Sequence, residues 1–321
     1  MRLGTLKRGG RDGTLVAVSA DGARVSPVPG WPTLQTVLDH WDLALPALHA
    51  AAAAAEPGEA VDPASFAAPL PRAWQWLDGS AFPTHGELMQ QAFHLPPIES
   101  DKPLMYQGLS HQFLGPTDDV PLPRETDGID FEGEFGVITG DVPMGCSAAD
   151  ALQHIRLIVL INDWSLRAIA PVEMKTGFGW VQAKPACSMA PFALTPDQLG
   201  DAWRDGRVCL PLTVEVNGQW FGNPNGDTMA YGFHELIAHA AYSRSLPAGT
   251  IIGSGTVSNP DHASVGSTCI SERRAIEMIE HGAPRTPFLT FGNRVKMHAG
   301  SAASNFGVID QQIIGSEAET M

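Results

Sequence analysis

The chain has 321 residues, of which 44% are hydrophobic and 17% charged, and its formal net charge is −15. This composition suits a globular protein with a sizeable core, in two domains or in one large domain with a small appendage. The acidic balance argues against a nucleic-acid partner or an anionic membrane surface, because the 20 lysines and arginines form no evident basic patch.

Neither the first residues nor any later stretch has the apolar run of a signal peptide or a membrane span, which predicts a cytoplasmic protein. The four cysteines are far apart and form no CxxC pair, so neither structural zinc nor a disulfide framework is indicated. The chain also lacks the G-x-S-x-G motif of serine hydrolases and a P-loop.

The first 70 residues predict a small unit. Residues 14–28 are typical of a β-hairpin with its turn at Asp21-Gly22. A helix is expected from about Thr33, interrupted at Pro46, with an alanine run at 50–55. A stretch rich in proline and alanine then runs to Pro71 and is typical of a linker. We therefore expect a small N-terminal β-rich domain at 1–70 and a larger domain at 71–321.

The larger part of the chain predicts mostly strands, so the expected fold class is α+β, predominantly β, and not a doubly wound α/β pattern. Ser147 begins a short predicted helix, and Asn217-Gly218 marks a tight hairpin turn. The other elements are expected, in chain order, as a strand at 155–162, a strand at 210–216, a helix at 233–242, a strand at 250–252 and strands at 286–297 and 305–314.

A pair of acidic residues is the most informative feature. Glu132 and Glu134 are two positions apart in a segment with alternating apolar residues, and in an extended chain such side chains point to the same face. Like charges held side by side repel each other unless a cation lies between them, and carboxylates are the preferred ligands of hard divalent cations. Asp163 is a further candidate ligand. The alternative is a half-exposed strand with a solvated acidic face.

Several separated segments together resemble the fumarylacetoacetate hydrolase family. They are the Glu132-x-Glu134 pair, Asp163-Trp164-Ser165-Leu166-Arg167, Gln182-Ala183-Lys184-Pro185 and Ile252-Gly253-Ser254-Gly255-Thr256-Val257-Ser258. The likeness runs from about Trp76 to the C-terminus. It implies a mixed β-roll catalytic domain, preceded by the small β-rich domain of longer members, and a homodimer. It also implies a bound Mg²⁺, with Ca²⁺ or Mn²⁺ as alternatives.

The resemblance implies that Glu132, Glu134 and Asp163 are metal ligands. It adds Asp78, because longer members carry an aspartate seven residues before a catalytic histidine and Asp78 precedes His85 by that interval. An aspartate that caps a loop beside a glycine is the alternative for Asp78.

By the same resemblance His85 is the general base, since an imidazole can take a proton from water at neutral pH. A carboxylate should orient it. The family's partner glutamate aligns near Ile270, whereas Glu272 lies two positions further on, on the expected strand face, and Glu87 is the other candidate. Lys184 is expected to meet the oxyanion charge that develops.

Four residues are expected to contact the substrate by resemblance: Tyr106, Arg167, Ser188 and Thr256. The alternatives are a core tyrosine for Tyr106 and a surface salt bridge for Arg167. Ala170 stands where the longer hydrolases carry a substrate-binding glutamine, so the chain departs from the family there.

The expected activity is metal-dependent hydrolysis of a carbon–carbon bond in a β-diketo acid, such as fumarylacetoacetate or an acylpyruvate, in aromatic catabolism including tyrosine degradation. The alternatives are a decarboxylase, hydratase or isomerase of a 2-keto acid on the same scaffold, and a non-catalytic protein that binds a keto acid. In each case the partner is a small keto acid.

Overall fold

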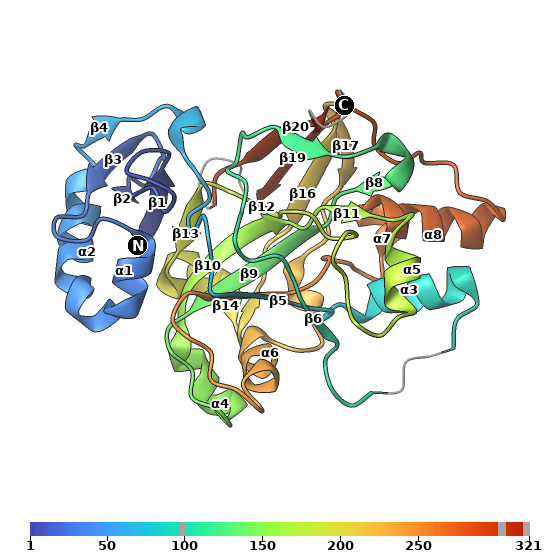
Figure 1. Ribbon diagram of the computed structural model, residues 1–321, viewed down its shortest axis with the longest axis horizontal. Coiled ribbons are helices and arrows are strands. Elements are labelled where there is room, and N and C mark those ends of the chain that lie inside the picture. Colours follow the sequence, from blue (N-terminus) through green and yellow to red (C-terminus); the bar gives the residue numbers. More distant parts are fainter. Residues whose placement is uncertain (97–99, 301–305, 317–321) are drawn as a thin grey trace.

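The computed structural model describes residues 1–96, 100–300 and 306–316, and it shows an α+β fold in which strands dominate (Figure 1). The strands of the first half are β1 (Arg2–Leu6), β2 (Thr14–Val18), β3 (Arg24–Pro27), β4 (Glu59–Ala60), β5 (Gln75–Gly79), β6 (Met105–Gln107), β7 (Val120–Leu122), β8 (Ile129–Asp130), β9 (Gly133–Thr139) and β10 (Ile155–Asn162). Those of the second half are β11 (Ser165–Leu166), β12 (Ser188–Met189), β13 (Phe192–Leu194), β14 (Trp203–Arg204), β15 (Arg207–Val208), β16 (Leu212–Val216), β17 (Gln219–Gly222), β18 (Thr250–Gly253), β19 (Arg294–Ala299) and β20 (Ile309–Gly315).

The helices lie mostly around these strands. They are α1 (Leu34–Asp39), α2 (Trp41–Ala55), α3 (Pro83–Phe93), α4 (Ala148–Ala151), α5 (Ala170–Met174), α6 (Phe233–Ala240), α7 (His262–Val265) and α8 (Ile270–His281). Short 3-10 turns occur at η1 (Pro63–Ser65), η2 (Glu125–Asp127), η3 (Leu152–His154), η4 (Pro196–Ala202) and η5 (Gly226–Thr228). Among the described residues, no helix combines the length and the apolar character needed to cross a bilayer.

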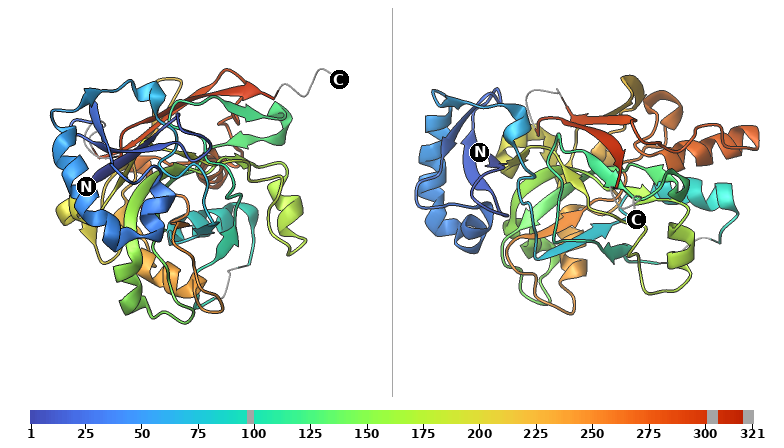
Figure 2. Two further views of the ribbon diagram at one scale, coloured as in Figure 1. Left: turned by 60° about the vertical axis from the view of Figure 1, so that its left-hand side comes forward. Right: turned by 45° about the horizontal axis from the view of Figure 1, so that its top comes forward.

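One long sheet runs through the molecule in the order β4-β3-β2-β1-β13-β10-β9-β18-β5-β6. The N-terminal strands and helices lie at one end (blue in Figures 1 and 2), and β1 joins them to the remainder by pairing antiparallel to β13. The predicted hairpin at 14–28 is confirmed by β2 and β3. The division of the chain at residue 70 stays a prediction, because the sheet is continuous across it.

The core has two compartments on the two faces of β9 and β10. Successive residues of a strand face opposite sides. Phe135 and Leu160 therefore pack with the second sheet, which has the order β17-β16-β19-β20-β7, while Ile138 and Leu157 pack in the compartment that also contains residues of α1 and α2. Every residue of β9 is buried. Central strands covered on both faces are consistent with the roll-like architecture that the family resemblance implies.

Three sequence-based predictions need correction. The N-terminal helix breaks at His40 and not at Pro46, which lies inside α2, because Leu48 and the buried alanines of that helix hold it against the sheet. The strand expected from residue 286 begins only at Arg294, after a stretch interrupted by Pro287 and Gly292. The last strand begins at Ile309, while the expected start at Asn305 lies outside the described residues.

Candidate metal centre and active site

Neighbouring strands bring three carboxylates together. Asp78 lies on β5, Glu134 on β9, and Asp163 directly after β10. β18 lies between β5 and β9, and Gly253 pairs with Asp78 on one side and with Gly136 on the other. A Cβ atom at Gly253 would lie 2.3 Å from Asp78 Oδ1, so this position requires a glycine to admit the carboxylate.

The carboxylates of Asp78, Glu134 and Asp163 each offer an oxygen within 4.8 Å of the others. All three side chains are buried. Neither oxygen of Glu134 has a hydrogen-bond partner among the described residues, although both are inaccessible to solvent. Desolvation first, and neighbouring carboxylates second, raise the pKa of both Asp78 and Glu134 well above the ordinary range.

A buried carboxylate without a donor is costly unless a cation compensates it. Glu134 is such a group among the described residues, and two further buried carboxylates lie within reach of it. This arrangement fits a hard divalent cation, which oxygen ligands bind. Glu132 lies just outside this group, between β8 and β9. It is linked to Asp163 through Lys184, whose Nζ contacts Glu132 Oε2 and donates to Asp163 Oδ2 at 2.6 Å.

Two cations balance the acidic cluster: Lys184, which is buried, and Arg167, whose side chain is 18% exposed. Arg167 donates from Nη2 to Glu132 Oε1 at 2.6 Å and from Nε to Asp130 Oδ2 at 2.8 Å. Burial would raise the pKa of Glu132, but Arg167 and Lys184 outweigh it and lower that pKa. Burial likewise disfavours the charged form of Lys184, yet Asp163 and Glu132 raise its pKa. Arg167 is therefore part of a buried ion-pair network, and the surface salt bridge considered for it is ruled out.

His85 lies in the first turn of α3, and its Nδ1 is 3.0 Å from Glu272 Oε2. Glu272 is fully buried in the first turn of helix α8, so the expectation that it lies on a strand face is wrong. The N-cap residue Cys269 begins the helix, because its sulfur accepts a hydrogen bond from the backbone N–H of Glu272. Glu87, the other candidate partner, is exposed.

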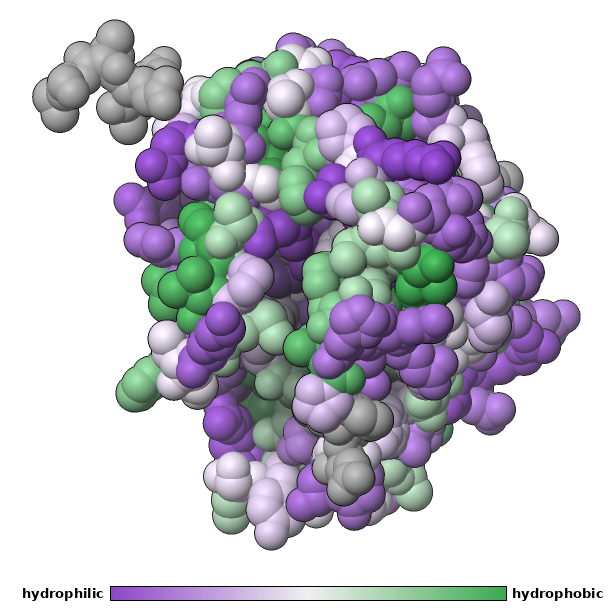
Figure 3. Space-filling model, turned by 90° about the vertical axis from the view of Figure 1, so that its right-hand side faces the viewer, coloured by the Kyte–Doolittle hydropathy of each residue, from purple (hydrophilic) through white to green (hydrophobic). Residues whose placement is uncertain are grey.

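The face of the molecule that carries α3, α5 and α8 is hollowed (Figure 3). The His85 side chain, on α3, is 18% exposed, whereas that of Glu272 behind it is 0% exposed. The base candidate can therefore contact solvent or a small molecule while its carboxylate partner cannot.

Tyr106 lies at the carboxylate cluster, where its hydroxyl donates to Asp163 Oδ2 at 2.7 Å. Burial and the charge of Asp163 raise the pKa of Tyr106 well above its ordinary value. The ring also packs edge-to-face against Trp180, and Lys184 Nζ is 5.4 Å and 5.5 Å from the centroids of the two rings. These aromatic faces add cation–π stabilisation to the ammonium group.

The remaining predicted contacts differ in their surroundings. Ser188 is buried and accepts a hydrogen bond from Trp164 Nε1 at 2.9 Å. Thr256 is buried in the turn after β18, next to Gly255, whose N–H donates to Asp78 Oδ1 at 3.0 Å. Ala170 begins α5 and is buried.

Sequence reasoning missed two groups that complete the site. Asp130 accepts hydrogen bonds from the backbone N–H groups of Ile270 and Ser271 at the start of α8, as well as from Arg167. The alternation of acidic residues at 130, 132 and 134 was the available signal. Cys187 Sγ lies 3.0 Å from Asp163 Oδ1. Nothing local in the sequence indicated that contact, because the two residues meet only through the pairing of β12 with β10.

Comparisons with known proteins agree with this architecture. Residues 75–314 match the model of the fumarylacetoacetate hydrolase C-terminal domain, and residues 1–72 match that of fumarylacetoacetase N-terminal domain 2. Among curated relatives, 2,4-didehydro-3-deoxy-L-rhamnonate hydrolase of Sphingomonas sp. (strain SKA58) is 30% identical over 163 residues, 50% of this chain and 54% of that protein. A mitochondrial oxaloacetate tautomerase of Rattus norvegicus is 26% identical over 48% of each chain.

Solved structures show the same fold over nearly the whole chain. Maleylpyruvate hydrolase from Sphingobium sp. SYK-6, in complex with manganese(II) and pyruvate, superposes with a TM-score of 0.67 at 17% identity, covering 99% of this chain and 100% of that one. A 5-carboxymethyl-2-hydroxymuconate delta-isomerase from Mycobacterium smegmatis gives 0.63 at 17% identity, covering 98% and 99%. By sequence, the chain spans about half the length of the curated relatives it matches. With both family models matched in order, the chain belongs to the fumarylacetoacetate hydrolase family.

Proposed function

We propose that the protein is a metal-dependent hydrolase that cleaves a carbon–carbon bond in a β-diketo acid, such as fumarylacetoacetate or an acylpyruvate. The observation that carries the proposal is the His85–Glu272 pair, at 3.0 Å, with a ring nitrogen of His85 within 4.8 Å of a carboxylate oxygen of Glu132, next to the carboxylate cluster. The manganese(II) and pyruvate bound to the Sphingobium hydrolase support a keto acid at a metal in this fold.

The residues that would hold the cation are Asp78, Glu134 and Asp163, with Glu132 as the fourth carboxylate. Mg²⁺ is the proposed ion, with Mn²⁺ or Ca²⁺ as alternatives. When bound, it would supply Lewis-acid polarisation of adjacent substrate oxygens. Arg167 and Lys184 remain as fixed positive charges that orient the acidic end of the substrate.

His85 would act on water. With Nδ1 directed to Glu272, its Nε2 can take a proton from a water molecule as the water oxygen bonds to a substrate carbonyl carbon. The adjacent carbon–carbon bond then breaks, its electron pair passes to the departing enolate carbon, and protonation of that carbon completes the hydrolysis. The ammonium of Lys184 and the hydroxyl of Tyr106 would stabilise the oxyanion formed on the way.

The alternatives are other reactions of a keto acid on the same scaffold: decarboxylation, hydration or isomerisation. The relatives include an oxaloacetate tautomerase and an isomerase, so the fold alone does not separate these reactions. The buried partner of His85 favours water activation, since a histidine oriented by a carboxylate is a competent general base. A non-catalytic keto-acid binder is the alternative from a different class.

The test is a panel of substrates, comprising fumarylacetoacetate, acylpyruvates and oxaloacetate, assayed with Mg²⁺, with Mn²⁺ and after chelation. Hydrolysis predicts loss of diketone absorbance with release of two acids, and loss of turnover on chelation. His85→Ala should lower turnover by about 100-fold or more while metal binding persists. If the protein interconverts tautomers or decarboxylates oxaloacetate but cleaves no diketone, the hydrolase proposal is wrong. If it binds a keto acid and forms no product, the non-catalytic alternative is supported.

The proposal includes a homodimer in the cytoplasm that acts in aromatic catabolism, including tyrosine degradation. Support for the catabolic role comes from the aromatic-pathway names of the structural neighbours. Light scattering of the purified full chain measures the assembly, and a monomeric mass would contradict the dimer.

A further inference from the structure

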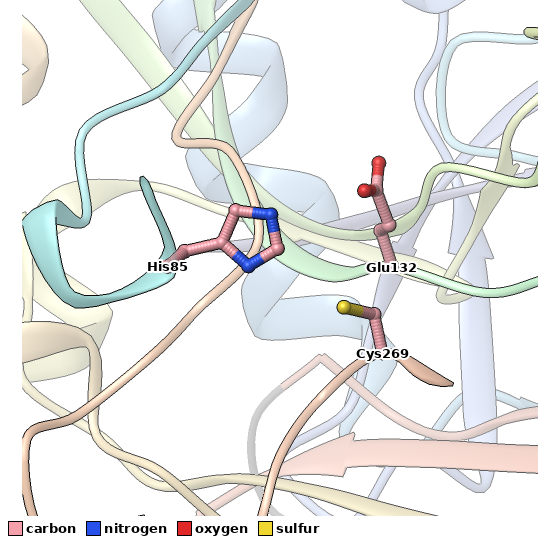
Figure 4. A group of neighbouring side chains, drawn as sticks. All are labelled: His85, Glu132 and Cys269. Carbon is pink, nitrogen blue, oxygen red and sulfur yellow. The ribbon is translucent and has the colours of Figure 1, made fainter. Parts of the chain in front are cut away.

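A second group of metal-binding side chains lies beside the carboxylate cluster. His85, Glu132 and Cys269 each present one ligand atom within 4.8 Å of the others. Figure 4 shows them converging from three separate segments: α3, the residues before β9, and the residue that precedes α8. Glu132 and Cys269 are buried, and His85 is partly accessible, so the group is not closed off from solvent at His85.

The donor chemistry of this group differs from that of its neighbour. Three carboxylates suit a hard cation, whereas a thiol sulfur, an imidazole nitrogen and one carboxylate suit zinc and similar ions. In a tetrahedral zinc site with bonds of about 2.0–2.3 Å, ligand atoms lie about 3.3–3.8 Å apart. The ligand atoms of His85, Glu132 and Cys269 are separated by at most 4.8 Å, so the two atoms furthest apart need to approach each other by no more than about 1–1.5 Å to bind zinc.

An independent observation also indicates a cation here. Zinc-binding histidines almost always present their second ring nitrogen to a carboxylate or carbonyl. His85 does so, since Nδ1 lies 3.0 Å from Glu272 Oε2, and Nε2 is left as the ligating nitrogen. Glu272 is fully buried, and its other oxygen, Oε1, has no hydrogen-bond partner among the described residues. This carboxylate is suited to balance a positive charge carried by the histidine.

We propose that His85, Glu132 and Cys269 form a second cation site, selective for a thiophilic divalent ion such as Zn²⁺, and that its occupation inhibits the enzyme. Glu132 can serve this site while it remains bonded to Arg167 and Lys184, because each carboxylate oxygen has two lone pairs. One lone pair on each oxygen is then left, one for this ion and one for the Mg²⁺ of the neighbouring cluster. Inhibition follows because the bound ion occupies the nitrogen that would take a proton from water. The inhibitory effect rests on the proposed hydrolase activity, but the binding does not.

The test uses Co²⁺ as a spectroscopic substitute for Zn²⁺, added to the full chain in excess Mg²⁺. A Cys146→Ser/Cys209→Ser background removes the two partly exposed thiols. We expect one equivalent of Co²⁺ to produce a thiolate-to-cobalt charge-transfer band that Zn²⁺ abolishes. Cys269→Ser should remove the band, whereas Cys187→Ser, the other buried thiol, should keep it. No band, or a band lost in Cys187→Ser and kept in Cys269→Ser, overturns the site.

A second set of variants keeps the proposal testable if Cys269→Ser folds poorly. His85→Ala removes the partly exposed imidazole that is proposed to bind the second ion. Glu272→Gln keeps that imidazole and changes only the carboxylate that it contacts. Changes of partner groups behind a ligand typically cost about 10–100-fold in metal affinity, so both variants should weaken Co²⁺ binding at least tenfold. Unchanged affinity in both would contradict the assignment. In excess Mg²⁺, Zn²⁺ should also inhibit turnover of the background protein but not of Cys269→Ser. Zn²⁺ binding without inhibition overturns the inhibitory role. If the protein shows no turnover with any substrate, the cobalt spectra alone decide whether the second site exists.

Discussion

At the scale of single residues, Glu134 decides the character of the site. Its carboxylate is fully buried, has no hydrogen-bond donor among the described residues, and lies next to two further carboxylates. Without a cation this arrangement opposes folding, because an unsatisfied buried polar group costs about 1–3 kcal/mol. A purely structural role does not explain a buried carboxylate without a donor, whereas cation binding explains it.

The variant Glu134→Gln isolates this effect. In the presence of chelator it should raise the free energy of unfolding by about 1 kcal/mol, because the amide avoids the cost that burial imposes on this carboxyl group, either of holding a charge or of taking up a proton, at nearly unchanged volume. The added stability that saturating Mg²⁺ gives the wild type should largely disappear, since the ion no longer binds the folded form tightly. Calorimetric melting with and without Mg²⁺ measures both effects. A variant less stable than the wild type in chelator would contradict the argument.

The raised pKa values of Asp78 and Glu134 predict how stability depends on pH in chelator. The folded protein holds protons that the unfolded chain releases above its pKa of about 4. These groups therefore contribute stability below that value, and the contribution is lost as the pH rises toward the raised folded pKa. The melting temperature of the metal-free wild type should fall more steeply with rising pH above about 4 than that of Glu134→Gln. Parallel curves of melting temperature against pH for the two proteins would contradict this prediction.

At the scale of elements, β18 sets the spacing of the cluster. Gly253 lies between Asp78 and Gly136, and a Cβ atom there would collide with the Asp78 carboxylate and with the Trp76 ring, both at 2.3 Å. The packing of a strand that bears none of the candidate ligands thus controls where the Asp78 carboxylate lies.

We therefore expect Gly253→Ala to destabilise the protein by about 1–3 kcal/mol through overpacking and to weaken Mg²⁺ binding by displacing Asp78. Gly140→Ala, just beyond β9, is the control, because the three atoms nearest to its Cβ would all belong to the flexible end of the Arg156 side chain. Chemical unfolding and Mg²⁺ titration report the two effects. Equal behaviour of the two variants would show that close packing at Gly253 does not position the carboxylate.

Some elements of this arrangement could be predicted from the sequence, and others could not. Strand 155–162 and the hairpin at 14–28 were predictable because a continuous apolar run, in the first, and turn residues between alternating segments, in the second, are local signals. The α8 helix was not, because its start depends on Asp130, which is 140 residues away and accepts the N–H of Ile270. For the same reason Glu272 was assigned to a strand although its proximity to His85 was anticipated. The contact of Lys184 with Trp180 likewise depends on tertiary packing.

At the scale of the whole molecule, the N-terminal unit is part of the main sheet. β1 pairs with β13, and Phe66 packs edge-to-face on Phe192 across that junction. Removal of this unit would leave β13 as an unpaired edge with exposed apolar residues, which is a known aggregation hazard.

A truncated chain that begins at residue 73 should accordingly be largely insoluble when produced alone. Co-production of residues 1–72 as a separate chain should restore soluble protein, because the missing strand can pair again. Fractionation of lysates, followed by circular dichroism of any soluble product, measures this. A soluble, cooperatively folding fragment 73–321 would show that the two parts are energetically independent.

Asp130 has a consequence for how the catalytic apparatus can change over evolutionary time. One oxygen accepts a hydrogen bond from the backbone of Ile270, at the start of the helix that carries Glu272, and the other accepts from the Arg167 guanidinium that also contacts Glu132. The proposed general base and the proposed metal centre are therefore both anchored at one aspartate. A homologue that acquires a new reaction through a shift of helix α8 should therefore also change its affinity for the metal ion. Reaction type and metal affinity should then differ together among homologues.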